Sequence, residues 1–483
     1  MKLPIAVLAV LTTVAGASLN AQISLIARGT LTSSRAGDYA DLSGLHNTLE
    51  NGAKANLLGG FGSGITHLSG DTFLAVPDRG PNAVSFDSAV DDTVSYIDRF
   101  HTIKMNLKPS RGSESDLPYT IEPELEATTL LWSATPLVYG SGLGLGSVGS
   151  GKPAQDNFFQ HYFTGRSDNF DPERNSGDPN DARLDPESIR ISNDGLSIFV
   201  SDEYGPYIYQ FSRLTGQRIR SYSLPAKYYV TKLSPMGDTE IADNTIGRVA
   251  NKGMEGLAIT PDGRTLVGIV QNSLIQDAND GDAGANMLRI ITLDVLTGRV
   301  EHEYAYNLGP GSGVSDLLAL NDHEFLVDER DGKGLADSVG SKAKVKQIFK
   351  IDLSKATDVS KMDGNTAATN AVTKTLFLDI VSVLKANGMD ATEIPAKIEG
   401  LSFGPDVTIK GVKTHTFWVA NDNDFLSDFE GTPNPNQFFV FGFTDKDLGG
   451  SKLVTQQSPF DFFPQPQYGF GHEGPGHGFG FPW

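Results

Sequence analysis

The sequence predicts an all-β fold, a β-propeller of about six or seven four-stranded blades. Three observations lead to this prediction: strand–turn–strand segments recur along the chain, glycine and proline separate short apolar runs, and few segments have a helical period. The chain has 483 residues, of which 39% are hydrophobic, so a large core is possible. A repeated sheet cannot bury both faces alone, and radial packing around a common axis solves that problem.

The clearest repeat consists of two predicted hairpins, residues 187–204 and 255–272. Each begins with a glutamate and a small residue, continues with alternating aliphatic residues to an Asp-Gly turn, and ends in polar residues. Asp-Gly between alternating strands is a strong hairpin signal. Looser versions of the same pattern occur at residues 63–79, 316–330 and 399–424.

Further strands are expected after the hairpins. Residues 207–222 and 287–306 each contain two strands around a Thr-Gly turn, which brings a unit to four strands. Residues 102–139 have a weaker period and are the expected place of a sixth or seventh blade. The strand at residues 23–31 is expected to pair with C-terminal strands and so close the ring.

The chain is predicted to have three parts: a signal peptide at residues 1–21, the propeller at residues 22–450, and a Gly/Pro/Phe/His tail at residues 451–483. Lys2 precedes an apolar run that is too short to span a bilayer, and small residues follow it. This pattern predicts secretion or export to the periplasm. An uncleaved N-terminal membrane anchor is the alternative.

Two internal segments look different from the repeats. Residues 141–185 are rich in Gly, Asn and Asp and are expected to form a long surface loop near one end of the channel. Residues 367–386 are expected to contain one short helix. His67 and His101 have no histidine partners at metal-ligand spacing, so packing or surface roles are expected.

Composition excludes several kinds of chemistry. The absence of cysteine rules out disulfides, thiolate metal sites and a cysteine nucleophile. The formal net charge of −20 disfavours nucleic acid and anionic membranes as partners and favours cations, although solubility alone also explains such a charge. We expect a monomer without a membrane span that acts on a small molecule.

Repeat geometry selects the candidate site, because corresponding residues of different blades meet near a propeller axis. One set of residues lies at the starts of the hairpins, and the other set lies at their ends. The first set is Glu187, Glu255, Asp316 and Glu399. The second set is Asp78, Asp202 with Glu203, Gln271 with Asn272, Asp328 with Glu329, and Asn421 with Asp422.

Clustered carboxylates stay ionised only when a cation or a basic residue compensates their charge. Carboxylate and amide oxygens suit Ca²⁺ or Mg²⁺ rather than zinc, and Ca²⁺ is the expected ion. Glu187, Glu203, Glu255 and Glu399 are the candidate ligands or general base, and Asp78, Asp202, Asp328 and Asp422 are further candidate metal ligands. Arg79, Arg330 and Lys252 are candidates to bind anionic groups. Alternatively, the repeated acids fasten neighbouring blades through hydrogen bonds.

Several of these segments resemble a known family. The segments DPESI (185–189), SDEYGP (201–206), GMEGL (253–257), KIEGL (397–401) and VPDRGPN (76–82) are similar to the phytase-like family described as having esterase-like activity. The resemblance covers about residues 55–445. It implies an exported β-propeller that hydrolyses ester or phosphoester bonds, but it carries over no established catalytic set. Ser63 stands where the first unit would have its acid, and the fourth hairpin is short.

Three functional hypotheses follow. The leading one is an exported hydrolase that cleaves a carboxylic or phosphoric ester in the central channel with the help of Ca²⁺. The second is a non-catalytic extracytoplasmic propeller that binds a ligand or protein through its loops. The third is a lactonase or sugar-oxidising propeller, which differs in substrate or cofactor.

Overall fold

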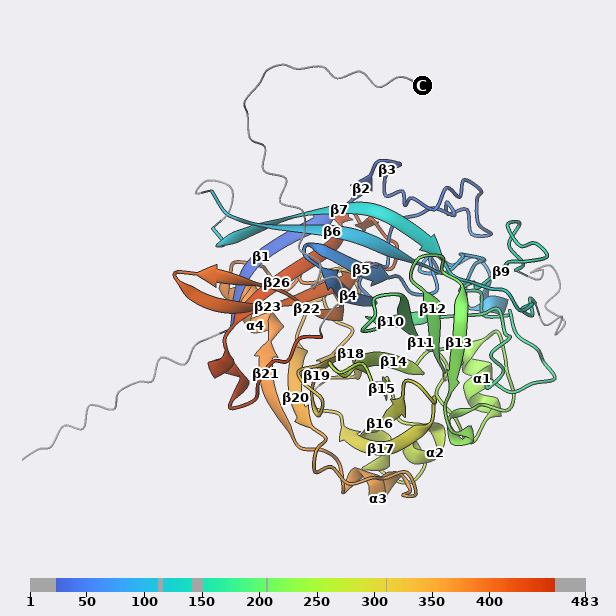
Figure 1. Cartoon of the computed structure of the whole chain (residues 1–483). Coiled ribbons are helices and arrows are strands. Elements are labelled where there is room, and N and C mark those ends of the chain that lie inside the picture. Colours follow the sequence, from blue (N-terminus) through green and yellow to red (C-terminus); the bar gives the residue numbers. More distant parts are fainter. Residues whose placement is uncertain (1–22, 112–115, 141–150, 206, 310, 457–483) are drawn as a thin grey trace, which may run out of the picture.

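Five antiparallel sheets of four strands each are arranged as the blades of a propeller (Figure 1). This is a computed structural model, and it describes residues 23–111, 116–140, 151–205, 207–309 and 311–456. The inner strand of each blade contacts the inner strands of its two neighbours, and β22 meets β4 to complete the ring. The prediction of an all-β propeller is confirmed.

The blades follow one another in chain order, and each is given from its inner to its outer strand. Blade 1 consists of β4 (Gly64–Ser69), β5 (Thr72–Val76), β6 (Arg99–Pro109) and β7 (Tyr119–Leu130). Blade 2 consists of β10 (Pro186–Ile191), β11 (Ser197–Asp202), β12 (Tyr207–Ser212) and β13 (Arg218–Ser223). Blade 3 consists of β14 (Met254–Ile259), β15 (Thr265–Val270), β16 (Met287–Asp294) and β17 (Val300–Asn307). Blade 4 consists of β18 (Gly313–Ala319), β19 (Glu324–Arg330), β20 (Lys346–Asp352) and β21 (Lys374–Asp379).

Blade 5 joins the two ends of the described chain. Its strands are β22 (Lys397–Ile409), β23 (Val412–Asp422), β26 (Asn436–Phe443) and β1 (Ser24–Leu31). The N-terminal strand β1 lies antiparallel to β26, with Ser24 opposite Gly442 and Leu31 opposite Asn436. The predicted closure of the ring by the first strand is therefore confirmed.

Smaller elements lie in the connections. Three two-stranded pairs are β2 (Ser33–Ser34) with β3 (Gly37–Asp38), β8 (Trp132–Ser133) with β9 (His161–Tyr162), and β24 (Asp428–Phe429) with β25 (Thr432–Pro433). The α-helices are α1 (Gly237–Asp243), α2 (Ile275–Ala278), α3 (Gly364–Ala368) and α4 (Ile380–Ala386). The 3₁₀ helices are η1 (Ser88–Val90), η3 (Ala226–Tyr228), η4 (Gly284–Asn286) and η5 (Asp445–Leu448). Among the described residues, none of these helices has both the length and the apolarity needed to cross a membrane.

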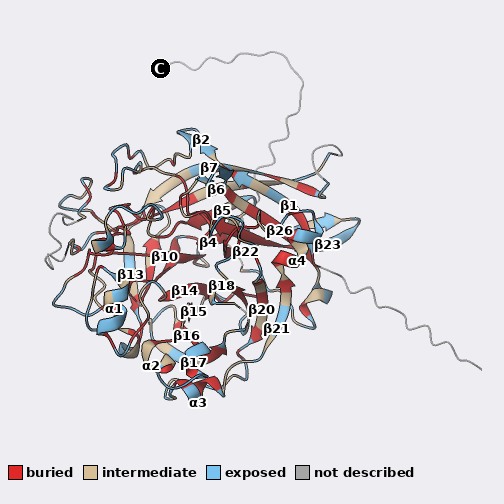
Figure 2. Cartoon of the chain, turned by 180° about the vertical axis from the view of Figure 1, so that it is seen from behind, coloured by how far each residue is buried: buried red, intermediate tan, exposed pale blue. Residues whose placement is uncertain are grey.

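The core lies between the blades, and the inner strands are buried almost throughout (Figure 2). One apolar cluster joins Leu257 and Ile290 of blade 3 to Leu317 of blade 4. Another joins Ile348 of blade 4 to the phenylalanines of blade 5, among them Phe417. Each blade thus buries its faces against its neighbours, as repeat architecture requires.

Glycine after the repeated glutamate allows the inner strands to approach closely. A Cβ on Gly256 would lie 2.8 Å from the backbone of Asp316 in blade 4, and one on Gly400 would lie 2.9 Å from the carbonyl oxygen of Gly62 in blade 1. No side chain fits at such distances. The Glu-Gly pairs of the sequence repeat therefore reflect the packing of neighbouring blades.

Some expectations require correction. The described residues form five blades rather than six or seven, because residues 102–139 belong largely to β6 and β7, the long outer strands of blade 1. The short helix expected within residues 367–386 is present as α4, although β21 and the end of α3 also lie in this range. In the described part of the predicted loop, residues 151–185, many side chains are buried, among them Phe163 and Phe170.

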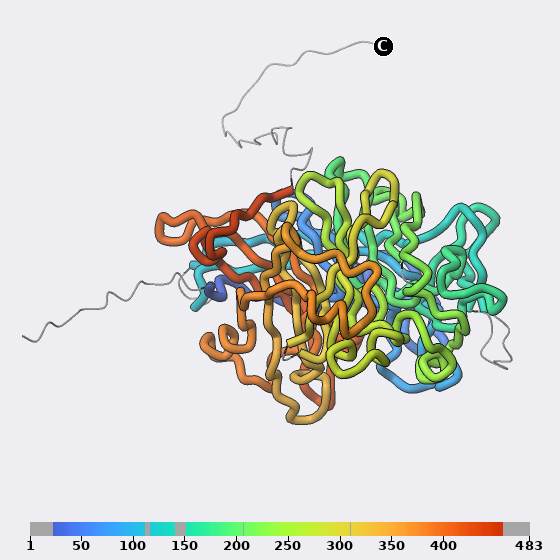
Figure 3. Tube along the Cα trace, turned by 90° about the horizontal axis from the view of Figure 1, so that it is seen from below, coloured from blue at the N-terminus to red at the C-terminus, as the bar shows by residue number. Residues whose placement is uncertain are grey.

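The two faces of the ring differ. The last described residues run across the face that carries the Asp-Gly turns, where Gln456 donates to the carbonyl oxygen of Ile191 and Val454 to that of Leu320 (Figure 3). A cavity of about 290 Å³ lies there, and its lining includes Arg190, Ile259 and Gln456. The predicted signal peptide and most of the predicted tail, residues 457–483, lie outside the described residues.

Candidate active site

The repeated glutamates stand at irregular positions of the inner strands. In blades 2 to 5 the pairing of the first two strands shifts near the start of the inner strand, between Pro186 and Ile189, Met254 and Gly256, Val314 and Leu317, and Ile398 and Leu401. Such β-bulges redirect side chains and are common beside active sites. Glu187, Glu255 and Glu399 lie within these bulges, on the face of the ring opposite the Asp-Gly turns.

These glutamates meet around the axis together with Glu203, which follows β11. All four are buried, with exposed fractions of 9% for Glu187, 2% for Glu203, 1% for Glu255 and 3% for Glu399. The charges of Glu203, Glu255 and Glu399 all act on Glu187, although these residues come from three blades. The sequence-distant residues predicted to converge are thus brought together.

Burial and mutual repulsion perturb the acidity of the four glutamates. Burial and the neighbouring carboxylates raise the pKa values of Glu187 and Glu255 well above the usual range. Burial raises the pKa of Glu203 to about 7, against the lowering effect of Arg79 and Arg248. Burial likewise raises the pKa of Glu399 to about 7, and Arg330 limits the rise.

In the part of the chain that the structure describes, one buried oxygen atom of each of three glutamates has no hydrogen-bond partner: Oε1 of Glu203, Oε2 of Glu255 and Oε2 of Glu399. An unsatisfied buried carboxylate oxygen is expensive, and native structures keep few of them without reason. The site therefore needs protons or cations that its own side chains do not supply.

Three basic residues line the same region. Arg79 pairs with Asp185 and donates to Asn251, Arg330 pairs with Glu399, and Lys397 pairs with Asp422 and Asp424. The predicted roles of Arg79 and Arg330 are not tested, but both lie beside site carboxylates. For Lys252, no ion pair with these carboxylates is present among the described residues.

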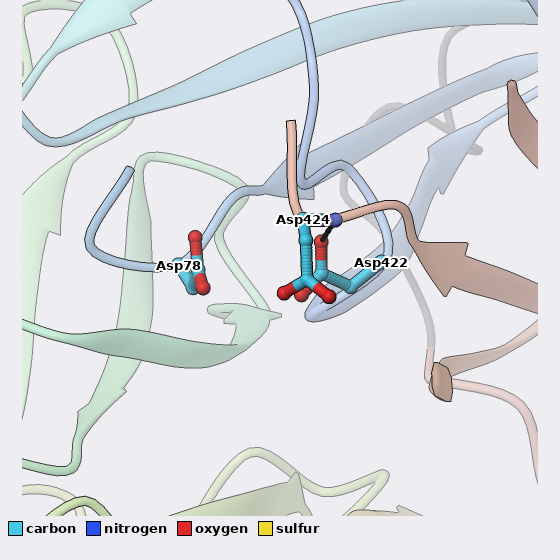
Figure 4. A group of neighbouring side chains, drawn as sticks. All are labelled: Asp78, Asp422 and Asp424. Carbon is cyan, nitrogen blue, oxygen red and sulfur yellow. Dashed lines mark hydrogen bonds between the residues drawn. The ribbon is translucent and has the colours of Figure 1, made fainter. Parts of the chain in front are cut away.

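Two groups of three acids have the spacing of metal ligands. The first group is Asp78, Asp422 and Asp424, with ligand oxygens all within 4.8 Å of one another. Asp78 follows β5 and faces the other two, which lie at and just after the end of β23 (Figure 4). Asp422 Oδ1 accepts a hydrogen bond from the backbone N–H of Asp424 (2.7 Å), and Lys397 Nζ lies 2.7 Å from Asp422 Oδ2.

The second group is Asp185, Glu187 and Glu203, within the same distance limit and fully inside the protein. Asp185 accepts a hydrogen bond from the backbone N–H of Arg79 (3.1 Å) and also forms an ion pair with the Arg79 guanidinium. The side chain of Glu187 takes part in no ion pair or hydrogen bond found among the described residues. This group therefore has less internal compensation than the first.

Two further predicted metal ligands, Asp202 and Asp328, differ in their hydrogen-bond partners. Asp202 accepts hydrogen bonds from the backbone N–H groups of Asp185, Tyr204 and Gly205, which fix the turn after β11. Burial nevertheless raises the pKa of Asp202 to about 8. Asp328 is fully buried, and neither of its carboxylate oxygens has a hydrogen-bond partner among the residues described.

Asp316 differs from the glutamates with which the repeat aligned it. The register of β18 places Ser315 at the position of Glu399, and Asp316 at that of Gly400. The carboxylate of Asp316 binds Arg190 (2.7 Å), the Ser188 hydroxyl (2.9 Å) and the backbone N–H of Leu401 (2.9 Å). It therefore connects blade 4 with blades 2 and 5, which is the fastener role of the alternative hypothesis.

Sequence reasoning did not select Asp185, Lys397 and Asp424 as site residues. A signal was present, because side chains two positions apart along a strand point to the same side. Asp185 and Lys397 each stand two positions before a repeated glutamate, and Asp424 stands two positions after Asp422.

A cavity of about 220 Å³ lies next to this region. Its lining includes Arg79, Asn82, Asp91, Tyr204 and Asn251. Arg79 thus borders both the cavity and the acidic group that contains Asp185.

Comparison with family models places residues 56–425 in the family described as "Phytase-like: Esterase-like activity of phytase". The chain belongs to the phytase-like family. The match covers all strands of the five blades except β26 and β1, and it includes every site residue discussed above. The resemblance seen in the sequence motifs is therefore confirmed.

Individual relatives add little about chemistry. An "Uncharacterized secreted protein" of Arthroderma benhamiae is 31% identical to this phytase-like chain over 177 residues, which is 31% of the chain and 34% of the relative. The matched stretch thus spans about a third of that relative.

Among solved structures, the aldose sugar dehydrogenase of Streptomyces coelicolor with bound PQQ is 10% identical and has a TM-score of 0.32, with 84% of each chain covered. The periplasmic gluconolactonase of Pseudomonas aeruginosa is 11% identical and has a TM-score of 0.30, with 78% of this chain and 87% of that chain covered. At these scores the similarities carry no argument about activity.

Proposed function

We propose that this protein is an exported hydrolase that cleaves a carboxylic or phosphoric ester of a small molecule at the acidic end of its propeller axis, assisted by a divalent cation. The observation that carries the proposal is the convergence of four buried glutamates, three of them with partnerless oxygens, beside Arg79, Arg330 and Lys397. Export is supported by the signal-like N-terminus and by the secreted relative.

Glu399 and Glu255 suit the two proton-transfer roles of ester cleavage. A general base works best when its pKa lies near the working pH, and burial raises the pKa of Glu399 to about 7. Glu255 has a higher pKa because several carboxylates surround it and burial disfavours its charge, so it stays protonated and can act as the acid. Glu399 would take a proton from the attacking water, and Glu255 would give one to the departing alcohol oxygen.

Arg330 and Arg79 suit the anionic groups of such a reaction. Arg330 lies beside Glu399, and its guanidinium can stabilise negative charge that develops on the ester oxygen. Arg79 borders the cavity that also contains Asn82 and Tyr204, from which a substrate could reach the glutamates. A bound cation would polarise the carbonyl or phosphoryl oxygen. The donor set fits such an ion, since hard cations prefer carboxylate oxygens.

The proposal is tested by assaying the purified protein on p-nitrophenyl butyrate and p-nitrophenyl phosphate, with Ca²⁺ and after chelation. We expect turnover of at least one substrate, loss of turnover on chelation, and recovery with Ca²⁺. Glu399→Gln should remove the activity. Turnover that chelation leaves unchanged contradicts the role of the cation, and equal turnover by Glu399→Gln contradicts the role of the base.

A non-catalytic propeller is the rival proposal. It is supported at Asp316, and at Glu329, which accepts hydrogen bonds from Tyr306 and the backbone N–H of Gly309 and pairs with Lys374. Glu203 and Glu255 share a side-chain hydrogen bond between blades 2 and 3, which a fastener would also make. Their other oxygens, Oε1 of Glu203 and Oε2 of Glu255, have no hydrogen-bond partner among the described residues, and a fastener does not explain these oxygens.

A further inference from the structure

We propose that Asp185, Glu187 and Glu203 together bind one Ca²⁺ ion, and that the neighbouring group of Asp78, Asp422 and Asp424 does not. The inference rests on the proposed function, because it selects the residues that hold the assisting cation. It narrows the sequence-based expectation, which named Glu187 and Glu203 among the candidate ligands or general base and Asp78, Asp202, Asp328 and Asp422 as further metal ligands.

The first argument is the spacing and type of the ligand atoms. The three carboxylates come from the start of β10 and from the turn after β11, and one oxygen of each lies within 4.8 Å of the others. Ca²⁺ binds oxygen at 2.3–2.6 Å in flexible geometry, so its ligands can be up to about 5 Å apart. Mg²⁺ requires a smaller and more regular set at 2.0–2.1 Å.

The second argument is the lack of other partners. Glu203 is 2% exposed, and no described residue donates a hydrogen bond to its Oε1. Glu187 has neither an ion pair nor a hydrogen bond among the described residues, although it lies against Glu203 and Asp185. Within this group Arg79 forms an ion pair with Asp185 alone, and its charge acts on Glu203 without a direct contact. Glu187 and Glu203 therefore have no ion pair among the described residues. A divalent ion provides the missing two charges and fills the coordination of both glutamates.

The competing group is already compensated. Lys397 pairs with both Asp422 and Asp424, so an ammonium group occupies the space that an ion would need. Asp422 Oδ1 also accepts the backbone N–H of Asp424, and Asp78 Oδ1 accepts that of Gly80 (3.1 Å). An ion there would have to displace Lys397.

Asp202 and Asp328 are excluded for separate reasons. The oxygens of Asp202 accept three backbone hydrogen bonds that hold the turn after β11. Asp328 belongs to neither group of closely spaced acids among the described residues. The ion therefore has its best ligands on blade 2 alone.

The test measures Ca²⁺ binding by isothermal titration calorimetry on the chelator-treated, full-length mature protein. The variants are Glu203→Gln and Glu187→Gln, with Asp424→Asn as the matched control that removes one negative charge from the other group. We expect wild type and the control to bind one ion with similar affinity. Each glutamine variant should bind it on the order of 100-fold more weakly, because one of three charged ligands is lost.

Several outcomes overturn the inference: no binding to wild type at millimolar Ca²⁺, full affinity in Glu203→Gln and Glu187→Gln, or loss of binding in Asp424→Asn. Melting curves without Ca²⁺ establish that each variant is folded. If one of the two glutamine variants does not fold, the other still tests the site. Hydrolysis is assayed separately. If calcium binds at blade 2 but no substrate is hydrolysed, the calcium site is supported and the proposed hydrolase function is contradicted. If a substrate is hydrolysed but calcium does not bind, the calcium site is contradicted and the hydrolase function is supported without the ion.

Discussion

Replacing Glu255 and Asp316 separately distinguishes an acid used for chemistry from an acid that fastens blades. Both are buried carboxylates near the starts of neighbouring inner strands. They differ in their partners. Asp316 binds Arg190, Ser188 and the backbone of Leu401, whereas Glu255 has a hydrogen bond to Glu203 but, among the described residues, no partner for its Oε2. The substitutions Glu255→Gln and Asp316→Asn both keep the shape of the side chain. Glu255→Gln removes the acidic proton of a neutral carboxyl group, whereas Asp316→Asn removes a negative charge.

The expected magnitudes follow from these partners. In Asp316→Asn the guanidinium of Arg190 remains buried without a countercharge, which costs about 3–5 kcal/mol. For 483 residues, at roughly 2.1 cal/mol/K per residue, the entropy of unfolding is about 1 kcal/mol/K, so the melting temperature should fall by about 3–5 °C. A protonated Glu255 carries no charge, and the glutamine amide can keep the hydrogen bond to Glu203, so Glu255→Gln should leave the melting temperature close to that of wild type.

Hydrolytic activity should fall more in Glu255→Gln than in Asp316→Asn. Loss of a general acid lowers turnover by about 10²–10⁴-fold, so Glu255→Gln should be nearly inactive while fully folded. Asp316→Asn should retain turnover well below its melting temperature. The assays are thermal unfolding and ester hydrolysis on the same preparations. If Glu255→Gln melts as early as Asp316→Asn, or hydrolyses as fast as wild type, Glu255 is not the acid.

Further predictions concern pH. Activity should rise with pH through about 7, as Glu399 loses its proton and becomes able to accept one, and a pH–rate profile that is flat across this range contradicts that role. Arg330→Gln removes the positive neighbour that lowers the pKa of Glu399, so the rising limb of the pH–rate profile should move to higher pH. If the rising limb does not move, a group other than Glu399 causes it. Burial raises the pKa of Asp181 from 3.8 to about 7, so between these pH values the folded state holds a proton that the unfolded state releases. The free energy of unfolding should therefore fall by up to about 4 kcal/mol as the pH rises from about 4 to 7. Asp181→Asn should therefore melt like wild type near pH 4 and higher than wild type at about pH 8, whereas parallel melting curves at all pH values count against this assignment.

The repeated hairpins made much of the fold predictable. The pattern of Glu187 and Glu255, followed by a small residue and an Asp-Gly turn, specified the two inner strands of a blade. The number of blades was overestimated because β6 and β7 are long outer strands without that pattern, and a periodic segment outside a hairpin was counted as a separate unit.

The convergence of Glu187, Glu203, Glu255 and Glu399 was also predictable, since the repeat placed them at equivalent ends of strands. The distinction between Asp316 and these glutamates was not, because it depends on a one-residue shift in register that the shortened hairpin concealed. The compensation of Asp422 by Lys397 was missed because it depends on side-chain geometry at the ends of β22 and β23.

The pairing of β1 with β26 has a consequence for how the molecule folds. Ser24 and Gly442 come from opposite ends of the described chain, so the last blade cannot form until almost all of the chain is present. Contacts of such long sequence separation make folding slow, because a large loop must close before they stabilise anything. Four blades can be complete while the ring is still open, and the edge of β26 then remains exposed to other chains. Deleting residues up to Leu31 should therefore promote aggregation of a protein whose remaining blades are intact.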